Sequence, residues 1–320
     1  MPRPRYAYLG PAGTFTEVAL RQVVSPDDAE YLPQTDVVSA IEAVRAGVAD
    51  HAVVAIESTI EGGVTATLDA LAVGDPLVLQ REVLVPVGFT LVGRPGVALA
   101  DVRRVAAHPH AWVQCRRWLG AHVPGAVHVV ATSNTAPAAL LADAGAGADG
   151  DALGFDAALV PPAAPAHYGL ADRVLAEGVA DNPEAVTRFV VVGRPGPVPP
   201  PTGADKTTLV VHLPSNEAGA LLTMLEQFAA RGVNLSRIES RPIGDSLGRY
   251  SFSMDAEGHI TEERMGEAFM GLHRVCPHVR YLGSYPRADR RAADVHIGTA
   301  DADFLAARDW LRSVRGGASV

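Results

Sequence analysis

The side chains best suited to chemistry gather in three short polar segments of the first 190 residues. Each segment follows an apolar run and precedes a helical pattern: Gly10–Thr14, Glu57–Gly62 and Thr132–Thr135. In open α/β sheets, ligands bind at the carboxyl ends of the strands, where helix N-termini favour anions. The three segments together predict a site for a small molecule that carries a carboxylate. Each segment alone is better explained as a helix cap or a tight turn, so both interpretations stay open.

Composition limits the chemistry further. The 320 residues hold 27 Lys+Arg against 36 Asp+Glu, a formal net charge of −9, and Lys206 is the one lysine. A Schiff-base mechanism needs a lysine of depressed pKa, and Lys206 lies far in sequence from the polar segments. The acidic balance argues against nucleic acid and against a membrane as partner, because both favour a basic face. A small anionic substrate held by local arginines, histidines or helix N-termini is compatible with it.

The cysteines and histidines give little support for redox or metal chemistry. Cys115 and Cys276 lie far apart in the sequence, so they form neither a disulfide framework nor a metal-type cluster. His108 and His110 have an H-x-H spacing without a third ligand nearby, so no metal is predicted. No cofactor motif is present either. Two cysteines, no secretory leader and no apolar run of about 18 residues predict a cytoplasmic protein.

The domain organisation follows from one segment rich in proline and glycine. This segment, 194–205, predicts a semi-rigid linker. In 1–193, strand-like apolar runs alternate with helical patterns, which is typical of a mostly parallel α/β sheet. In 206–286, the order β-α-β-β-α-β predicts a ferredoxin-like fold. The tail 287–320 is polar, with one helix expected near Phe304–Val314.

Apolar periodicity places the elements within these domains. The strands predicted before the linker are Tyr6–Leu9, Ala52–Ile56, Val83–Val92, Val102–Ala107, Val127–Ala131, Ala157–Val160 and Phe189–Val192. The helices predicted there are Thr16–Val24, Val37–Ala46, Val64–Ala72, Ala111–Ala121 and Thr135–Ala144. After the linker we expect strands at Thr207–Leu213, Leu235–Ile243, Arg249–Met254 and Val279–Tyr285, and helices at Gly219–Gly232 and after Thr261. On the first of these helices, the expected buried face is Leu221, Leu222, Leu225 and Phe228.

Six motifs in a fixed order carry a resemblance to a known family. They are Tyr8–Phe15, Ile56-Glu57 through Glu61-Gly62, His108-Pro109 through Gln114-Cys115, Thr187-Arg188-Phe189, Gly219–Leu222 and Glu239–Pro242. Residues 5–286 resemble bacterial prephenate dehydratase with a C-terminal ACT regulatory domain. The resemblance implies a bilobal, periplasmic-binding-protein-like catalytic part, made of two α/β subdomains with a cleft. It also implies that the ferredoxin-like βαββαβ domain is an ACT domain.

The resemblance implies an activity and its control. The expected reaction, with no cofactor, is the decarboxylating dehydration of prephenate to phenylpyruvate in L-phenylalanine biosynthesis. The ACT domain is expected to bind L-phenylalanine as an allosteric feedback inhibitor. Because ACT domains pair side by side, a homodimer or homotetramer is expected.

The resemblance also implies roles for individual residues. Thr187 is expected to donate a hydrogen bond to the leaving hydroxyl. The rest of the expected catalytic set is Glu57, Ser58 and Gln114. The expected substrate contacts are Thr14, Phe15, Asn134, Thr135, Arg188 and Phe189. The expected phenylalanine contacts are Gly219, Ala220, Leu221, Leu222, Asn234, Glu239, Ser240, Arg241 and Pro242.

Several alternatives stay open. Without the resemblance, Thr187 reads as a β-branched residue that opens a strand. Arg188 is equally well explained by a structural ion pair, because neighbours on a strand point to opposite faces. Ser58 stands where the family usually has Asn, and His110 where Gln is common. Arogenate is an alternative substrate, a ligand sensor an alternative class of protein, and the second domain is alternatively a plain dimerisation module.

Overall fold

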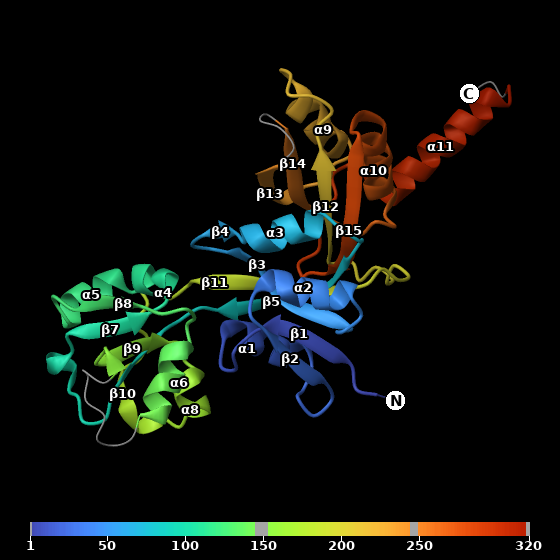
Figure 1. Cartoon of the computed structure of the whole chain (residues 1–320). Coiled ribbons are helices and arrows are strands. Elements are labelled where there is room, and N and C mark those ends of the chain that lie inside the picture. The colour runs from blue at the N-terminus through green and yellow to red at the C-terminus, as the bar shows by residue number, and fades with distance from the viewer. Residues whose placement is uncertain (1, 145–152, 244–248, 318–320) are drawn as a thin grey trace. The chain divides into compact units, whose positions relative to one another are not determined.

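The computed structural model describes residues 2–144, 153–243 and 249–317, which form two compact units (Figure 1). Unit 1 comprises Met1–Val64 and Val83–Phe189, and unit 2 comprises Thr65–Glu82 and Val190–Val320. The segment 65–82 thus packs with the C-terminal part of the chain. The predicted domain limits place this segment in the first domain, 1–193.

The first lobe is built on a six-stranded sheet of order β2-β1-β3-β11-β5, with β4 paired to β3. Its strands are β1 Arg5–Leu9, β2 Glu30–Gln34, β3 His51–Ser58, β4 Gly62–Gly63, β5 Val78–Pro86 and β11 Val186–Gly193. Helices α1 Phe15–Val23 and α2 Val37–Arg45 connect its first strands. β1 runs parallel to both β2 and β3, so the segments that follow β1 and β3 leave the same edge.

The second lobe of unit 1 has its own five-stranded sheet, of order β10-β6-β9-β7-β8 (Figure 1). The strands are β6 Thr90–Gly93, β7 Arg104–Ala107, β8 Val127–Val130, β9 Ala157–Val160 and β10 Val174–Ala176. The helices are α4 Pro109–Gln114, α5 Arg116–His122, α6 Ala136–Asp143 and α8 Ala164–His167, and two short 3₁₀ turns lie at Leu99–Asp101 and Ala171–Arg173. β7 is parallel to β8 and β9, while β6 is antiparallel to β9. The chain passes between the two lobes twice, from β5 to β6 and from β10 to β11. Two α/β lobes confirm the predicted fold class.

Two expected elements differ from the structure, and an edge strand was not predicted. The run Val83–Val92, predicted as one strand, is divided between β5 and β6, because Pro86 has no N–H for a further ladder bond. The predicted helix Ala111–Ala121 breaks at Cys115, whose backbone leaves the helical region at φ −114°, ψ 9°. β2 was not predicted at all. It is a polar strand that contains Pro33, which an edge strand tolerates.

Unit 2 contains the ferredoxin-like fold predicted from the element order. Its elements are β12 Asp205–His212, α9 Ala220–Ala229, β13 Leu235–Pro242, β14 Tyr250–Glu257, α10 Glu263–Val275 and β15 His278–Pro286. The sheet order is β13-β14-β12-β15, which leaves β13 and β15 at the edges. One face packs on α9 and α10 through a cluster that includes Leu209, Val211, Met224, Phe228, Met254 and Met265.

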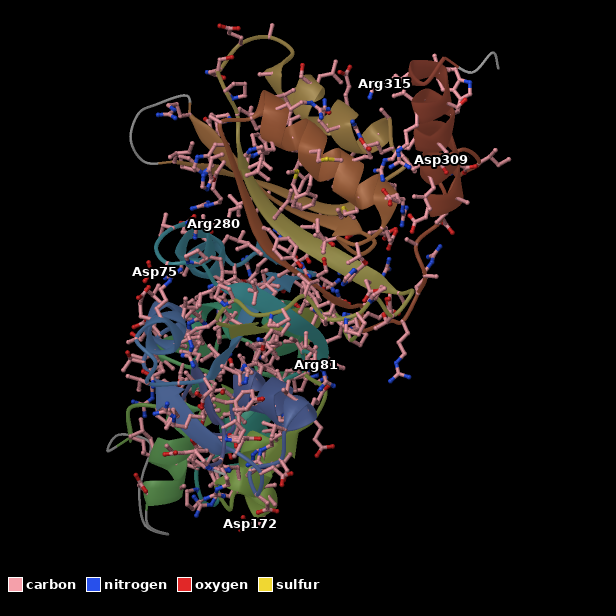
Figure 2. All side chains as sticks on the ribbon, turned by 90° about the vertical axis from the view of Figure 1, so that its right-hand side faces the viewer. Asp75, Arg81, Asp172, Arg280, Asp309 and Arg315 are labelled. Carbon is pink, nitrogen blue, oxygen red and sulfur yellow. The ribbon has the colours of Figure 1, made fainter. Side chains whose placement is uncertain are left out.

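The expected tail helix is present as α11, Asp301–Arg315. Arg308 on α11 forms ion pairs with Glu263 and Glu267 of α10, which attach the helix to the domain. Figure 2 shows Asp309 and Arg315 on its surface.

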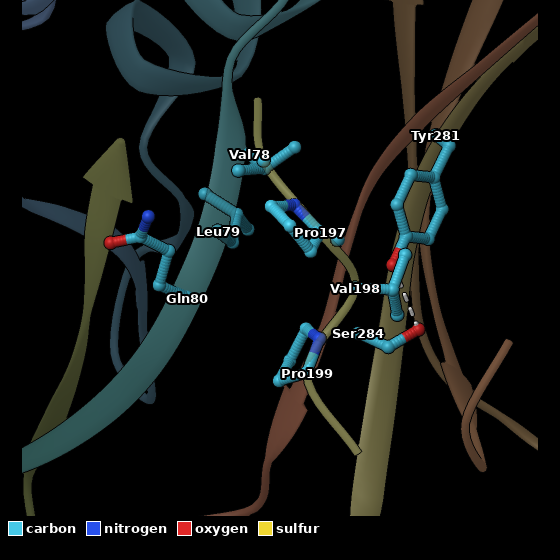
Figure 3. A pocket seen from close by; sticks show the side chains of 10 residues that line it. Val78, Leu79, Gln80, Pro197, Val198, Pro199, Tyr281 and Ser284 are labelled. Atoms are coloured by element: carbon cyan, nitrogen blue, oxygen red, sulfur yellow. Dashed lines mark hydrogen bonds between the residues drawn. The ribbon is translucent and has the colours of Figure 1, made fainter. Parts of the chain in front are cut away.

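The segment 65–82 and the linker pack within unit 2. Helix α3, Thr65–Ala72, leads to the first half of β5. Lys206 Nζ donates to Glu82 Oε2 at 2.9 Å, in a buried pair at the end of this segment. Linker residues Pro197–Pro199 line a cavity of about 270 Å³ with β5 and with Tyr281 and Ser284 of β15 (Figure 3).

Gly283 on β15 permits a close backbone approach, which leads to a stability prediction. Its φ is +121°, and a Cβ there would lie 2.3 Å from the carbonyl oxygen of Leu79. We expect Gly283→Ala to lower the melting temperature by about 4–8 °C, from overpacking of about 2 kcal/mol. Gly298→Ala is the matched control, because Gly298 has a φ of +83° but no atom within 4 Å of its Cβ position. Equal shifts in the two variants, measured by circular dichroism, would contradict the close-packing explanation.

Candidate active site

The glycine-containing turn after β1 lies against the second lobe. Thr14 caps α1 by accepting a hydrogen bond from Glu17 N at 3.3 Å, and its hydroxyl donates to Leu9 O at 3.1 Å. A Cβ at Gly13 would lie 3.3 Å from Tyr168 Cε2 and 3.6 Å from Thr135 Cγ2. The Tyr168 hydroxyl donates to the carbonyl oxygen of Ala12 at 2.9 Å. The first and third polar segments are therefore neighbours, although the strands that they follow, β1 and β8, belong to different sheets.

The second polar segment also reaches the second lobe, through Glu61. Gln114 Nε2 on α4 donates to Glu61 Oε1 at 3.3 Å. Glu61 Oε2 forms an ion pair with Nδ1 of His110 when that imidazole is protonated. The rings of His108 and His110 stack with centroids 5.0 Å apart. Segments from both lobes thus contact one another at two places in unit 1.

Glu57, Ser58 and Thr187 lie at the adjoining ends of two neighbouring strands. The backbone N–H of Thr59, just after β3, donates to Val186 O at 3.0 Å, and Val186 N donates to Thr59 Oγ1 at 3.0 Å. These bonds place the end of β3 beside the start of β11. Thr187, the second residue of β11, is partly exposed. The structure therefore brings together three residues that the resemblance placed in the catalytic set.

Arg188 takes a structural position. It is buried, and its Nε donates to Glu57 Oε2 at 3.1 Å. Thr187 and Arg188 project to opposite faces of the strand, so the two side chains do not share a face of the sheet. This arrangement supports the ion-pair interpretation of Arg188 over direct binding of a substrate carboxylate.

The apolar and amide candidates surround the same turns. Phe15 packs edge-to-face on Phe89 with centroids 5.7 Å apart, and Phe189 is buried. Two buried oxygens, Gln114 Oε1 and Asn134 Oδ1, have no hydrogen-bond partner in the part of the chain that the structure describes. Buried polar atoms normally have a partner, so these acceptors can receive donors from a ligand.

Burial sets the protonation of several groups near these turns. Burial, together with the neighbouring His110, lowers the pKa of His108, whose Nδ1 accepts from His110 N. Burial raises the pKa of Tyr168, so its hydroxyl stays a donor at neutral pH. Burial also raises the pKa of Cys115 to about 12. These groups are neutral at pH 7, so we assign them hydrogen-bonding or packing roles.

The residues expected to bind phenylalanine divide between two faces of the ferredoxin-like sheet. Gly219, with φ +90°, caps α9, which begins with Ala220. Of the buried face predicted for α9, Phe228 is buried and Leu225 packs against the core. Leu221 and Leu222 are exposed, because Met224 turns toward the core in their place. Asn234 precedes β13 and is exposed. On β13, Ser240 pairs with Phe252 of the helix-facing cluster, whereas Glu239 and Arg241 alternate to the opposite face.

Three residues at the turns were missed as candidates. Glu61 and His110 lie inside motifs, so their motif positions were the signal that could have found them. Tyr168 has no sequence signal, because it contacts Ala12 from 156 positions away.

Known proteins match the chain over nearly its whole length. A family model described as prephenate dehydratase matches residues 6–197. A prephenate dehydratase of Amycolatopsis methanolica is 44% identical over 98% of both chains.

Solved structures give the same result. A prephenate dehydratase of Arthrobacter aurescens in complex with L-Phe is 51% identical, with a TM-score of 0.90 over 98% of this chain and 99% of that one. The chain belongs to the prephenate dehydratase family. It is therefore an enzyme of the carbon–oxygen lyase class.

A structure with the description of a novel type of quorum-quenching acylase, GqqA, is 29% identical. It has a TM-score of 0.74 over 90% of this chain and all of that one. The fold of the family therefore also occurs in a protein with a different described activity.

Membrane-spanning helices and groups of metal ligands are both absent from the part of the chain that the structure describes. None of the helices there is long and apolar enough to cross a membrane. Within residues 2–144, 153–243 and 249–317, no three His, Cys, Asp or Glu side chains are grouped as metal ligands.

The raised pKa of Cys115 leads to a prediction about its reactivity. A pKa of about 12 in place of 9.0 leaves the thiol protonated at pH 8, with about a thousandfold less thiolate than an exposed cysteine. We expect iodoacetamide at pH 8 to leave Cys115 unmodified in the folded protein and to alkylate it in urea. Mass spectrometry of the digested protein measures both states. Rapid alkylation of Cys115 without urea would contradict its burial.

Proposed function

We propose that the chain converts prephenate into phenylpyruvate, carbon dioxide and water. The observation that carries this proposal is the position of Thr187 beside Glu57 and Ser58. The first and third polar segments contact each other in the same unit. Membership of the prephenate dehydratase family supports it.

The reaction requires little of the protein beyond positioning and one donor. The bond from the ring to its carboxylate breaks, and its electron pair moves into the ring. The bond from the ring to the hydroxyl then breaks on the far side, which leaves an aromatic ring. Thr187 donates a hydrogen bond to the departing hydroxyl, and a proton from the solvent converts that hydroxyl into the water that leaves. Donors fixed before the reaction stabilise the charge that develops on that oxygen.

The substrate carboxylates need cations or N–H donors other than the Arg188 guanidinium, which already pairs with Glu57. The start of α1, where Thr14 caps the helix, offers backbone N–H groups of the kind that bind anions. Gln114 Oε1 and Asn134 Oδ1 are candidate acceptors for the single hydroxyl group of the substrate. Phe15 and Phe189 provide apolar contacts for the ring.

We further propose that the ferredoxin-like domain is an ACT domain through which L-phenylalanine inhibits the enzyme. In sequence, we propose a catalytic part at 1–193, from which 65–82 packs within unit 2, a linker at 194–205, a regulatory part at 206–286 and a tail at 287–320. The L-Phe complex of the 51% identical relative supports this proposal.

We also propose that the chain forms a cytoplasmic homodimer or homotetramer. Leu221, Leu222 and Ile238 are exposed, with Ile238 on the edge strand β13. These residues offer apolar surface for a second copy, and burying such surface is a common basis of stable self-association.

The role of Thr187 is tested by removing its hydroxyl. We expect Thr187→Ala to lower kcat for phenylpyruvate formation by about 10²–10⁴-fold, the range of a general-acid or donor contribution. Thr187→Ser keeps the hydroxyl and is expected to retain most of the rate. The absorbance of phenylpyruvate measures both variants. Full turnover by Thr187→Ala would remove Thr187 from the mechanism.

Substrate and effector choice are tested in one series of assays. We expect turnover of prephenate to exceed that of arogenate in parallel reactions. We expect millimolar L-phenylalanine to lower the initial rate, and D-phenylalanine, the control, to have little effect, because the carboxylate and ammonium positions differ between them. Turnover that L-phenylalanine leaves unchanged would retain the enzyme and reject its regulation.

A further inference from the structure

The polar face of the ferredoxin-like sheet is buried. Along β12, Leu209 and Val211 point toward α9 and α10, so Thr208 and Val210 point the other way. Thr208 and Val210 are nevertheless 0% and 1% exposed. Another segment of the chain therefore covers this face of the sheet.

Both edge strands of this sheet contact the segment 65–82. From β15, Arg280 donates to the carbonyl oxygens of Leu71, Val73 and Gly74 at 3.0–3.3 Å, which fixes the C-terminal end of α3. Figure 2 shows Arg280 near Asp75, just beyond this end. From β13, Arg241 pairs with Asp69 of α3. Helix α3 is thus attached to both edges of the regulatory sheet.

The Arg241–Asp69 ion pair is bidentate, so its two hydrogen bonds fix the relative orientation of the two side chains. Nε of Arg241 lies 2.9 Å from Asp69 Oδ1, and Nη2 lies 3.0 Å from Oδ2. The pair is partly open to solvent, with side-chain exposures of 28% and 50%. It therefore adds little to overall stability, but it fixes how α3 is oriented on β13.

Arg241 and Ser240 face opposite sides of one strand. Ser240 pairs with Phe252 on the side that carries α9, whose first turn begins at Gly219. Arg241 pairs with Ser251 on the side where it reaches Asp69. Adjacent residues of β13 thus connect the helix side of the sheet and α3.

Helix α3 is joined directly to one of the three polar segments. Glu57 pairs with Gly63 and Ser58 with Gly62, so the segment is a closed hairpin. Val64 N then donates to Ile56 O at 2.8 Å, and α3 begins at Thr65. With one residue between hairpin and helix, a displacement of α3 pulls on Glu57 and Ser58 through the chain itself.

We propose that Arg241 is a positioning residue that transmits the binding of phenylalanine to the Glu57–Gly62 hairpin through Asp69. This role rests on the proposed function, because it requires an effector on the helix side of β13. The Arg241 side chain thus transmits the effect of phenylalanine and does not contact phenylalanine itself. Asp69 is the corresponding residue on α3, and it lies outside the proposed catalytic and effector-binding sets.

The experiment measures phenylalanine binding and phenylalanine inhibition separately. Full-length wild type, Asp69→Asn and Asp69→Glu are each assayed for inhibition by L-phenylalanine, and the same preparations are titrated with it by calorimetry. The matched control is Asp309→Asn, because Asp309 forms an ion pair with Arg312 on the exposed helix α11. Melting curves establish that each variant is folded.

We expect Asp69→Asn to keep its uninhibited rate within about twofold and to saturate with phenylalanine. Its inhibition at saturation should be weaker by about threefold or more, within the range of mutations that alter coupling between sites. Asp69→Glu keeps the carboxylate and should retain most of the inhibition, and Asp309→Asn should match the wild type.

Other outcomes overturn the inference in distinguishable ways. An Asp69→Asn variant that is inhibited like the wild type rejects the role of the pair alone. A variant whose inhibition falls only because phenylalanine no longer binds rejects transmission in favour of direct binding. Wild type that binds no phenylalanine rejects the proposed regulation together with this inference, and wild type without prephenate turnover rejects the proposed activity as well.

Discussion

The ion pair between Arg188 and Glu57 is the interaction on which the catalytic part of the structure depends. A buried guanidinium is costly unless a carboxylate accepts its protons, and Glu57, 131 positions earlier, supplies that carboxylate. The pair requires β11 to return beside β3 after the second lobe has formed. Because the chain makes this return, Thr187 arrives next to Ser58 and projects to the face opposite Arg188.

The same pairing resolves how an acidic chain can hold an acidic substrate. Arg188 is occupied, and Lys206 is buried against Glu82, so neither is available as a mobile countercharge. A Schiff-base mechanism is thus excluded by the position of Lys206 and also by its ion pair with Glu82. We propose that backbone N–H groups and local polar side chains, which are fixed before the substrate arrives, bind its carboxylates.

The sequence predicts the parts of this structure that depend on local patterns. Alternating strands and helices and the βαββαβ order follow from periodicity and from the order of the elements. The exchange of 65–82 into unit 2 could not be predicted, because it rests on Arg280, Arg241 and Gly283, whose partners lie about 170 to 210 positions away. The break at Cys115 and the edge strand β2 were missed because tertiary context overrides weak local propensity there.

Motif matching and strand geometry give different information about Arg241. A motif treats Glu239, Ser240, Arg241 and Pro242 as one group, and so assigns them one ligand. A strand divides them, because alternate side chains point to opposite faces, and Arg241 reaches Asp69 while Ser240 stays on the side of α9. Four adjacent residues on an edge strand can therefore serve two partners at once. Under the proposed regulation, this division connects the ferredoxin-like domain, through α3, to the chain segment that enters the Glu57–Gly62 hairpin.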